Sequence, residues 1–320
     1  MQANTMNHEL TRLERVAQNR PSLWVAVAFS LLGQLGFVLL FNLLLPSLGS
    51  NLGQAGRILL GLLFSLVPGG LWLYFFYRQD AVEPEPKRMV LGVFMVGALL
   101  TAALYQPVLQ GIFTVDGWLL EHWWTHLLGG ILIVGFFEQF LVYLAVRFAV
   151  FEAPEFDERV DGVIYAIAAG LGFATVINFA YVVKHGGVDL DVGSIRMVIN
   201  ALAHACFAGI FGYFIGQSKF ETTPWHYLPM GMAISAGVNG LFTFLLERTG
   251  SGGLSYNPWP NLILCAILAV AVLLFVFWLV ARANEETLRV ARATHGTSAP
   301  ASQSSSLVIT KPATQEVANG

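Results

Sequence analysis

Charged side chains are scarce in this sequence. They make up 12% of its 320 residues, with 17 basic and 20 acidic side chains, whereas about a quarter of an ordinary soluble domain is charged. A formal net charge of −3 without a basic cluster argues against a nucleic-acid partner. Cysteine is also rare. Cys206 and Cys265 both lie in apolar runs, which excludes a disulfide framework and a Cys-x-x-Cys metal site.

Long hydrophobic runs take the place of the missing charge. Hydrophobic residues make up 56% of the chain, and its mean hydropathy is +0.64. A helix needs about 20 apolar residues to cross a bilayer core, which predicts an all-α fold, a polytopic membrane helical bundle of about eight transmembrane helices. The predicted spans lie near residues 22–45, 57–77, 89–110, 126–151, 160–183, 195–217, 226–247 and 259–281.

The distribution of basic residues predicts the orientation of the chain. Of the 17 lysines and arginines, 13 fall on the side that carries both termini and 4 on the other. Cytoplasmic loops are enriched in these residues, so both termini are predicted in the cytoplasm and the bundle in the plasma (inner) membrane. Residues 1–21 form a cytoplasmic segment without the features of a signal peptide, 22–282 the transmembrane domain, and 283–320 a largely disordered cytoplasmic tail.

One carboxylate falls in the middle of a predicted span. Glu138, next to Gln139, lies roughly 18 Å from the outer end of its helix, and His204 roughly 15 Å from the outer end of another. Asn239 and Asn178 lie roughly 12 Å and roughly 8 Å deep on two further spans. These depths predict that the side chains meet in one polar pocket. Because an ionisable group is costly inside a bilayer, Glu138 and His204 are candidates for function.

Other features have a structural interpretation. Asn200, one turn before His204, and Thr243 are predicted to form ordinary interhelical hydrogen bonds. Small residues along 160–183 and 195–217 suit a docking helix from a partner. The acidic loops at 78–88 and 152–159 are predicted to be a solvated cap or acids that complement a helix N-terminus, as Asp157, Glu158 and Asp161 would. Four tryptophans near span ends are predicted to be interfacial anchors, namely Trp72, Trp225, Trp259 and Trp278.

Four motifs follow one another within residues 57–282. They are Tyr-Arg-Gln-Asp-Ala-Val-Glu-Pro-Glu-Pro at 77–86, Pro-Glu-Phe-Asp-Glu with Val-Asp-Gly at 154–162, Gly-Leu-Gly-Phe-Ala-Thr at 170–175, and a helix with a histidine at 204–213. Together they resemble the PrsW-type intramembrane metalloproteases, which are related to the CAAX-type glutamate intramembrane proteases. The resemblance implies a membrane-embedded peptidase that takes a transmembrane protein as substrate. Its partners are then that substrate or a partner helix and the lipid bilayer.

The family pattern is only partly kept. The resemblance implies that Glu138 and His204 are catalytic and bind any metal present, with Gln139, Asn239 and Asn178 as auxiliary groups. The chain departs from the pattern at five positions, where Gln139 replaces Glu, Val142 Lys, Ile177 Glu, Asn239 His and Thr243 Asp.

Zinc is the cofactor that the resemblance implies, but the ligand set argues against its stable binding. A catalytic zinc normally has three protein ligands, whereas Glu138 and His204 are the two strong ones here and amides are weak ligands. The sequence therefore predicts a PrsW-like homologue that binds a transmembrane substrate, with cleavage weakened or lost. A metal-free reaction, with Glu138 activating water and His204 or Asn239 stabilising the oxyanion, stays open. The alternative is a non-catalytic binding or scaffold protein, a pseudoprotease. A transporter is the least favoured class, because no inverted repeat is visible.

Overall fold

A computed structural model describes residues 28, 32–40, 43, 53–78, 85–184, 192–247 and 259–297 of the chain. Every regular element in these ranges is a helix, which confirms the all-α fold. Seven helices there are long and apolar enough to cross a membrane, at Gln54–Tyr77, Lys87–Ile112, Trp123–Ala149, Arg159–Lys184, Ile195–Phe220, Tyr227–Leu246 and Ile263–Thr287. The predicted span at 22–45 lies mostly outside the described residues, as do residues 1–21 and 298–320, so the count of eight stays a prediction.

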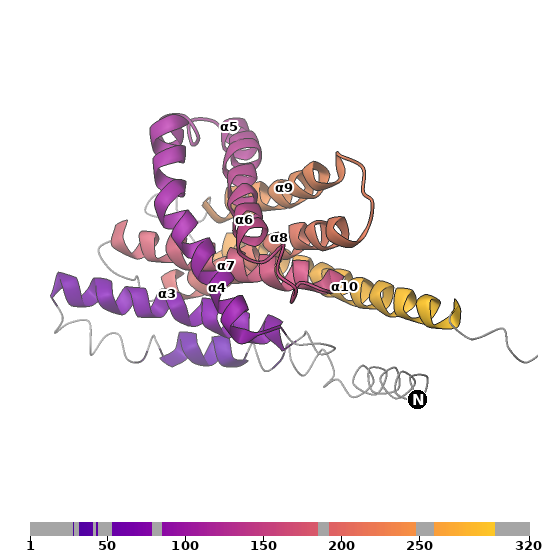
Figure 1. The fold of residues 1–320 in the computed structure, drawn as a ribbon. Coiled ribbons are helices and arrows are strands. Elements are labelled where there is room, and N and C mark those ends of the chain that lie inside the picture. Colours follow the sequence, from indigo (N-terminus) through magenta and orange to yellow (C-terminus); the bar gives the residue numbers. More distant parts are fainter. Residues whose placement is uncertain are drawn as a thin grey trace, which may run out of the picture.

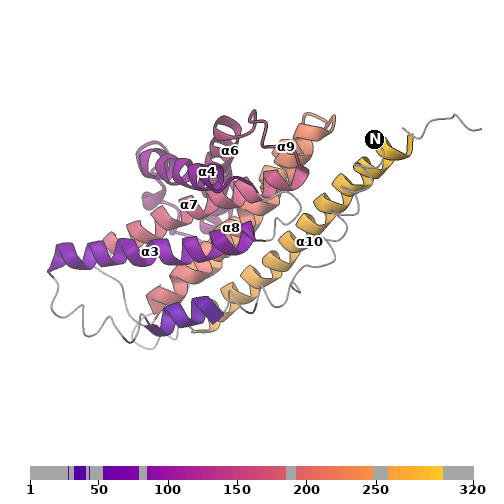
Figure 2. The same cartoon turned by 60° about the horizontal axis from the view of Figure 1, so that its bottom comes forward.

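Helices α7 (Arg159–Lys184) and α8 (Val192–Phe220) form the centre of the bundle. Their apolar windows are 78% and 89% buried, against 28–44% for the other spans. Figure 2 shows α4 (Lys87–Leu100) and α6 (Phe136–Ala149) on one side of this pair and α10 (Trp259–Thr297) on the other. Helices α3 (Gln54–Tyr77) and α9 (Tyr227–Glu247) complete the surroundings (Figure 1).

Small residues allow α7 and α8 to approach each other closely. A Cβ atom at Gly162 would lie 2.5 Å from the carbonyl oxygen of Gly212, and one at Gly170 would lie 2.5 Å from the Cβ of Ala208. Such contacts between small residues are a usual basis of helix packing in membranes. At these positions α7 and α8 use the small residues to pack against each other, and a docking helix stays a prediction.

Two of the spans contain π-helical segments. Helix α4 continues into η1 (Thr101–Tyr105) and η2 (Pro107–Ile112), and a turn with the short 3₁₀ helix η3 (Val115–Gly117) follows. The chain returns through α5 (Trp123–Gly129) and η4 (Gly130–Gly135) into α6. π-helical turns occur frequently at functional sites. Because η4 leads directly into α6, the first turn of α6 is a candidate position for such a site.

A close contact joins this turn to α9. A Cβ atom at Gly135 would lie 2.7 Å from the carbonyl oxygen of Ala236, and one at Gly240 would lie 2.4 Å from the side chain of Ile131. The two glycines let the backbones of η4 and α9 approach within van der Waals contact. This approach places the middle of α9 beside the start of α6.

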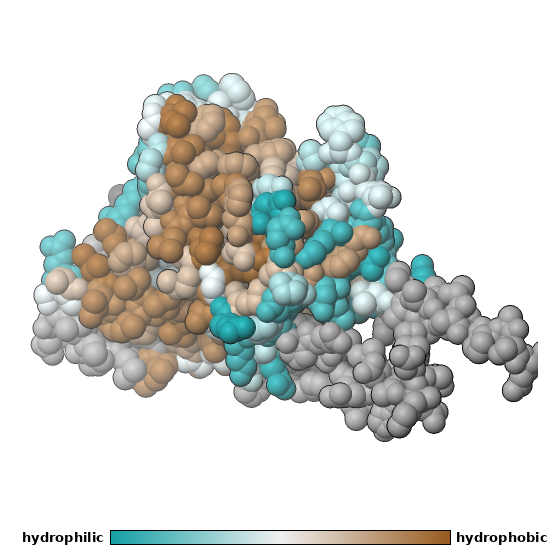
Figure 3. All heavy atoms as spheres, in the orientation of Figure 1, coloured by the Kyte–Doolittle hydropathy of each residue, from teal (hydrophilic) through white to brown (hydrophobic). Residues whose placement is uncertain are grey.

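The outer surface is apolar. Figure 3 shows hydrophobic residues covering the upright helices, with polar residues gathered below and to the right of them. Exposed leucines of the spans Lys87–Ile112 and Trp123–Ala149 include Leu91, Leu99, Leu128 and Leu132. An apolar surface of this extent is what a bilayer requires of a spanning bundle. The protein is integral to a membrane.

One predicted interfacial anchor lies in the core instead. Trp72 is 1% exposed, and its ring lies 5.6 Å from that of Phe75, which in turn lies 5.6 Å from that of Phe277 on α10. The prediction for Trp72 is wrong because the ring belongs to the core in which α3 packs against α7 and α8, which the sequence does not reveal. Trp225 and Trp278 are exposed, as an anchor must be, and the side chain of Trp259 lies outside the described residues.

Three side chains lie together at the end of the bundle where α4 and α7 begin. We call Glu85, Asp161 and Tyr165 the Glu85 cluster. The Tyr165 hydroxyl donates to Glu85 Oε2 at 2.5 Å. Asp161 Oδ2 accepts the backbone N–H groups of Asp157 (2.9 Å) and Glu158 (2.6 Å), so Asp161 fulfils its predicted role at a helix start. The prediction of a solvated cap is wrong for Glu85, which is 3% exposed. Burial is the main cause that raises the pKa of Glu85 above its ordinary value.

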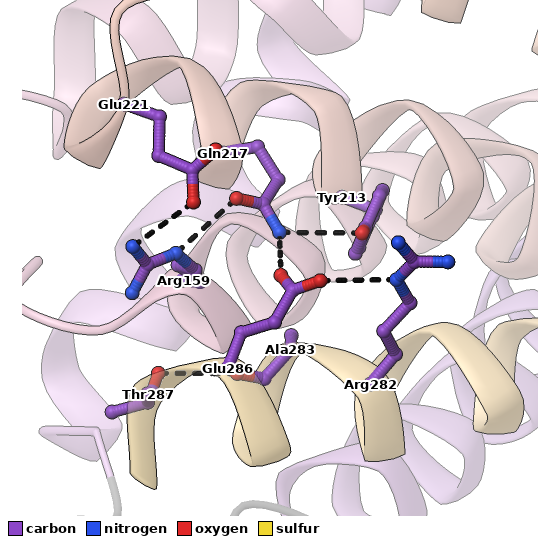
Figure 4. A network of polar contacts seen from close by, with 8 residues as sticks. All are labelled: Arg159, Tyr213, Gln217, Glu221, Arg282, Ala283, Glu286 and Thr287. Carbon is purple, nitrogen blue, oxygen red and sulfur yellow. Dashed lines mark hydrogen bonds and ion pairs between the residues drawn. The ribbon is translucent and has the colours of Figure 1, made fainter. Parts of the chain in front are cut away.

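A second polar network at the same end connects three helices (Figure 4). Arg159 Nε on α7 donates to Gln217 Oε1 on α8 at 3.2 Å, and its Nη2 pairs with Glu221 at 3.1 Å. The amide of Gln217 also donates to Glu286 on α10, and Arg282 Nε lies 3.0 Å from Glu286 Oε1. These side chains fix α10 against the central pair.

Candidate functional site

Glu138, in the first turn of α6, is the centre of the candidate site. Its side chain is 1% exposed, and both carboxylate oxygens have partners. Oε1 lies 2.6 Å from Nδ1 of His204 on α8, and Oε2 accepts a hydrogen bond from Nδ2 of Asn239 on α9 at 2.5 Å. Thr243, one turn further on α9, donates to Asn239 Oδ1 at 3.3 Å. The structure thus brings Glu138, His204 and Asn239 together from three helices.

A second set of hydrogen bonds extends from the other ring nitrogen of His204. Nε2 lies 3.0 Å from Asn200 Oδ1, and Asn200 Nδ2 donates to Asn178 Oδ1 on α7 at 2.9 Å. Asn178 Nδ2 in turn donates to the carbonyl oxygen of Met197 at 3.1 Å. Asn178 therefore reaches the site through Asn200. The contact with Asn178 confirms the interhelical hydrogen bond predicted for Asn200. The additional contact with His204 was not predicted, although the spacing of four residues places both side chains on one face of the helix.

Aromatic rings surround the histidine. The ring centroid of Phe173 lies 5.1 Å from that of His204, and the ring of Phe207 lies 5.7 Å away in an edge-on arrangement. Tyr105, at the end of η1, packs edge-on against Phe173 at 5.0 Å. These apolar walls strengthen electrostatic interactions within the site. Nothing in the sequence distinguishes these three rings among 24 phenylalanines and 9 tyrosines, so they could not be predicted.

Gln139 is adjacent to Glu138 in sequence but does not join the same hydrogen bonds. Its side chain is fully buried, and neither amide atom has a hydrogen-bond partner among the described residues. Successive residues of a helix point about 100° apart, which separates this amide from the carboxylate of Glu138. A buried amide without a partner costs free energy. Within the described part of the chain, Gln139 therefore has hydrogen-bonding capacity that no other residue uses.

The arrangement does not fit a catalytic zinc ion. Within the described residues, no group of three or more His, Cys, Asp or Glu side chains lies close enough together to hold a metal. Zinc is bound by ligand atoms at about 2.0–2.2 Å, each directing a lone pair at the metal. Glu138 Oε1 and His204 Nδ1 instead lie 2.6 Å from each other. The two strong candidate ligands therefore bind each other.

A family model described as PrsW family intramembrane metalloprotease matches residues 85–282. This chain belongs to the PrsW family. The matched region contains every helix that contributes to the candidate site. The family's description implies a metal, and that implication conflicts with the side chains found around Glu138.

Curated proteins named Protease PrsW are similar to this chain. The one from Geobacillus kaustophilus is 30% identical over 197 residues, which cover 59% of this chain and 84% of the relative. The one from Oceanobacillus iheyensis is 26% identical over 226 residues, covering 70% and 95%. The one from Bacillus subtilis is 27% identical over 191 residues, covering 57% and 80%. No solved structure matches the chain.

Proposed function

We propose that this PrsW-family protein binds a transmembrane segment of another membrane protein and has lost metal-dependent cleavage. The observation that carries the proposal is that the hydrogen-bonding atoms of Glu138 and His204 are all occupied. Both oxygens of Glu138 and both ring nitrogens of His204 have side-chain partners. A zinc peptidase needs lone pairs directed at the metal and a carboxylate free to accept a proton from water. Neither is free in this arrangement.

The location of the protein is part of the proposal. We infer that both termini lie in the cytoplasm and that the bundle lies in the plasma membrane, which the 13 to 4 distribution of lysine and arginine supports. A partner helix would approach through the bilayer along the apolar surface. Because Glu138 and His204 are buried, helices must separate for a partner to reach them. We expect η1, η2 and η4 to move, since π-helical turns have less regular backbone hydrogen bonding than an α-helix.

The decisive experiment measures metal and cleavage together. The protein is purified in detergent without added metal, its zinc content is determined, and it is incubated with a panel of single-span membrane proteins. The Bacillus subtilis relative is treated in parallel. We expect well below one zinc per chain and no cleavage. Stoichiometric zinc together with cleavage that a chelator abolishes would overturn the proposal.

A gain-of-ligand variant provides the matched control. Gln139→Glu, Ile177→Glu and Asn239→His together restore the residues that the family pattern implies. If metal binding was lost through these substitutions, the triple variant should bind zinc while the wild-type protein does not. Equal zinc content in both would mean that these positions do not control metal binding.

A second function is favoured by one observation. The 2.6 Å contact between Glu138 and His204, beside the Asn239 amide, is the geometry of an acid–base pair with a neighbouring donor. In a metal-free hydrolysis, Glu138 would first have to release one of these contacts. It would then take a proton from water, and His204 or Asn239 would stabilise the oxyanion. Cleavage that resists chelators but disappears in both Glu138→Ala and His204→Ala would select this function over binding alone.

A further inference from the structure

The hydrogen bonds beyond His204 have a fixed direction. They begin at the carbonyl oxygen of Met197, which can only accept a hydrogen bond. Asn178 must therefore present its Nδ2 to Met197, at 3.1 Å, and its Oδ1 to α8. Asn200 Nδ2 donates to that Oδ1 at 2.9 Å. The orientation of Asn200 is thereby set by a backbone atom two steps away.

This direction determines which atom of Asn200 meets the histidine. With its Nδ2 engaged by Asn178, Asn200 presents Oδ1 to His204 Nε2 at 3.0 Å. A carbonyl oxygen cannot donate, so Nε2 must carry the hydrogen. Reversing both amides would place Asn178 Oδ1 against the Met197 carbonyl oxygen, leaving two acceptors in contact inside a buried site.

We propose that Asn200, oriented by Asn178, is a positioning residue that keeps a hydrogen on Nε2 of His204 and turns Nδ1 onto Glu138. Metal-bound histidines commonly use such a partner to fix the ring. Here the other ring nitrogen, Nδ1, lies 2.6 Å from Glu138 Oε1. A hydrogen must also lie between these two atoms, so Nδ1 has no lone pair left for a metal. The inference rests on the proposed function, in which His204 binds no metal. It explains how the chain keeps His204 oriented toward Glu138 without a metal, in a site that has only two strong candidate ligands.

The test reads the two ring nitrogens directly. The full-length protein is labelled with ¹⁵N-histidine, stripped of metal and studied in detergent micelles by long-range ¹H–¹⁵N correlation. Of the 7 histidines, the signals of His204 are assigned from their loss in His204→Gln. We expect a hydrogen on Nε2 that exchanges slowly with water. A wild-type ring with a bare Nε2 would overturn the proposal.

Variants of the two asparagines distinguish positioning from packing. Asn200→Ala removes the acceptor and should accelerate exchange of the Nε2 hydrogen by roughly tenfold, about the effect of losing one hydrogen bond. Asn178→Ala frees the Asn200 amide to turn and should give an intermediate rate. A folded Asn200→Ala protein with the wild-type spectrum would overturn the proposal.

Ser235→Ala is the matched control. Ser235 is fully buried and donates to the carbonyl oxygen of Phe207 on α8 at 2.6 Å, so the variant loses a comparable bond near the histidine but outside this chain of amides. Its His204 signals should stay unchanged, and a shift as large as in Asn200→Ala would contradict positioning. Zinc is then added to the wild-type protein. A shift of His204 signals by zinc would overturn the proposed function while leaving the metal-free assignment intact.

Discussion

Two buried carboxylates in this molecule are stabilised in different ways. Glu138, in the middle of the bundle, contacts nitrogen atoms of His204 and Asn239. Glu85 lies at the end of the bundle where α4 and α7 begin. It contacts the hydroxyl of Tyr165 and lies close to a second acidic side chain, that of Asp161. Glu138 has donors on both oxygens, whereas Glu85 accepts a hydrogen bond from one hydroxyl and lies near the acidic residues Asp157 and Glu155.

The surroundings of Glu85 determine how readily it takes up a proton. A hydroxyl donor favours the charged form of a carboxylate, whereas burial and neighbouring acids favour the protonated form. Burial is the largest cause of the raised pKa of Glu85, and the charges of Asp157 and Glu155 add to it. The Glu85 cluster therefore binds a proton readily, while the surroundings of Glu138 are organised around donors.

Removing Glu138 should have the largest effect on stability. Glu138→Ala leaves the donors of His204 and Asn239 buried without an acceptor, which we expect to lower the free energy of unfolding by about 3–5 kcal/mol. Glu138→Gln keeps the shape and one acceptor oxygen, so it should cost about 1–3 kcal/mol. Both values are measured by reversible unfolding in mixed micelles. An equal cost for the two variants would show that hydrogen bonding contributes little at this site.

Overpacking the contact between α7 and α8 should have the second largest effect on stability. The two variants below test the Glu85 cluster and the surroundings of Glu138 separately. Gly162→Ala acts beside Asp161 and Gly170→Ala acts against the backbone of His204. Each should cost about 1–3 kcal/mol in the same unfolding assay. Gly92→Ala on α4 is the control, because a Cβ atom there meets nothing within 4 Å, and it should be neutral or slightly stabilising. Should Gly92→Ala destabilise as much, close packing would not explain the losses.

Tyr165→Phe should have a smaller effect, confined to the Glu85 cluster. The variant removes the hydroxyl that donates to Glu85 Oε2 while keeping the ring. A cost of about 1–2 kcal/mol is expected, since a buried acceptor loses a donor. Tyr74→Phe, on an exposed tyrosine of α3, should change the unfolding free energy by less. If Tyr165→Phe also moved the His204 signals, the two regions would not be independent.

The pH dependence from Glu85 should be the smallest effect. The pKa of Glu85 is raised above its ordinary value of 4.5, so the folded protein holds this proton more tightly than the unfolded chain. The resulting stabilisation is complete below 4.5 and is lost as the pH rises through the raised pKa. Relative to Glu85→Gln, the wild-type protein should thus lose stability as the pH rises above 4.5. A difference that stays constant or grows with pH contradicts the assignment.

Much of the fold and part of the site could be predicted from the sequence. Apolar runs gave seven spans at the predicted places, because bilayer thickness fixes helix length. The depth of Glu138, His204 and Asn239 along their helices correctly predicted that they meet. The burial of Trp72 and Glu85 could not be predicted, since both depend on which neighbouring helix or segment covers them.

The sequence by itself determined that this is a membrane-embedded helical protein of PrsW type with a single carboxylate in mid-span. Only the tertiary structure decided what that carboxylate does within the protein. Hydrogen-bond direction depends on which atoms of Asn178, Asn200 and Asn239 face their neighbours, and helices distant in sequence set those contacts. Composition and spacing name the polar groups, whereas packing decides which of them are already paired.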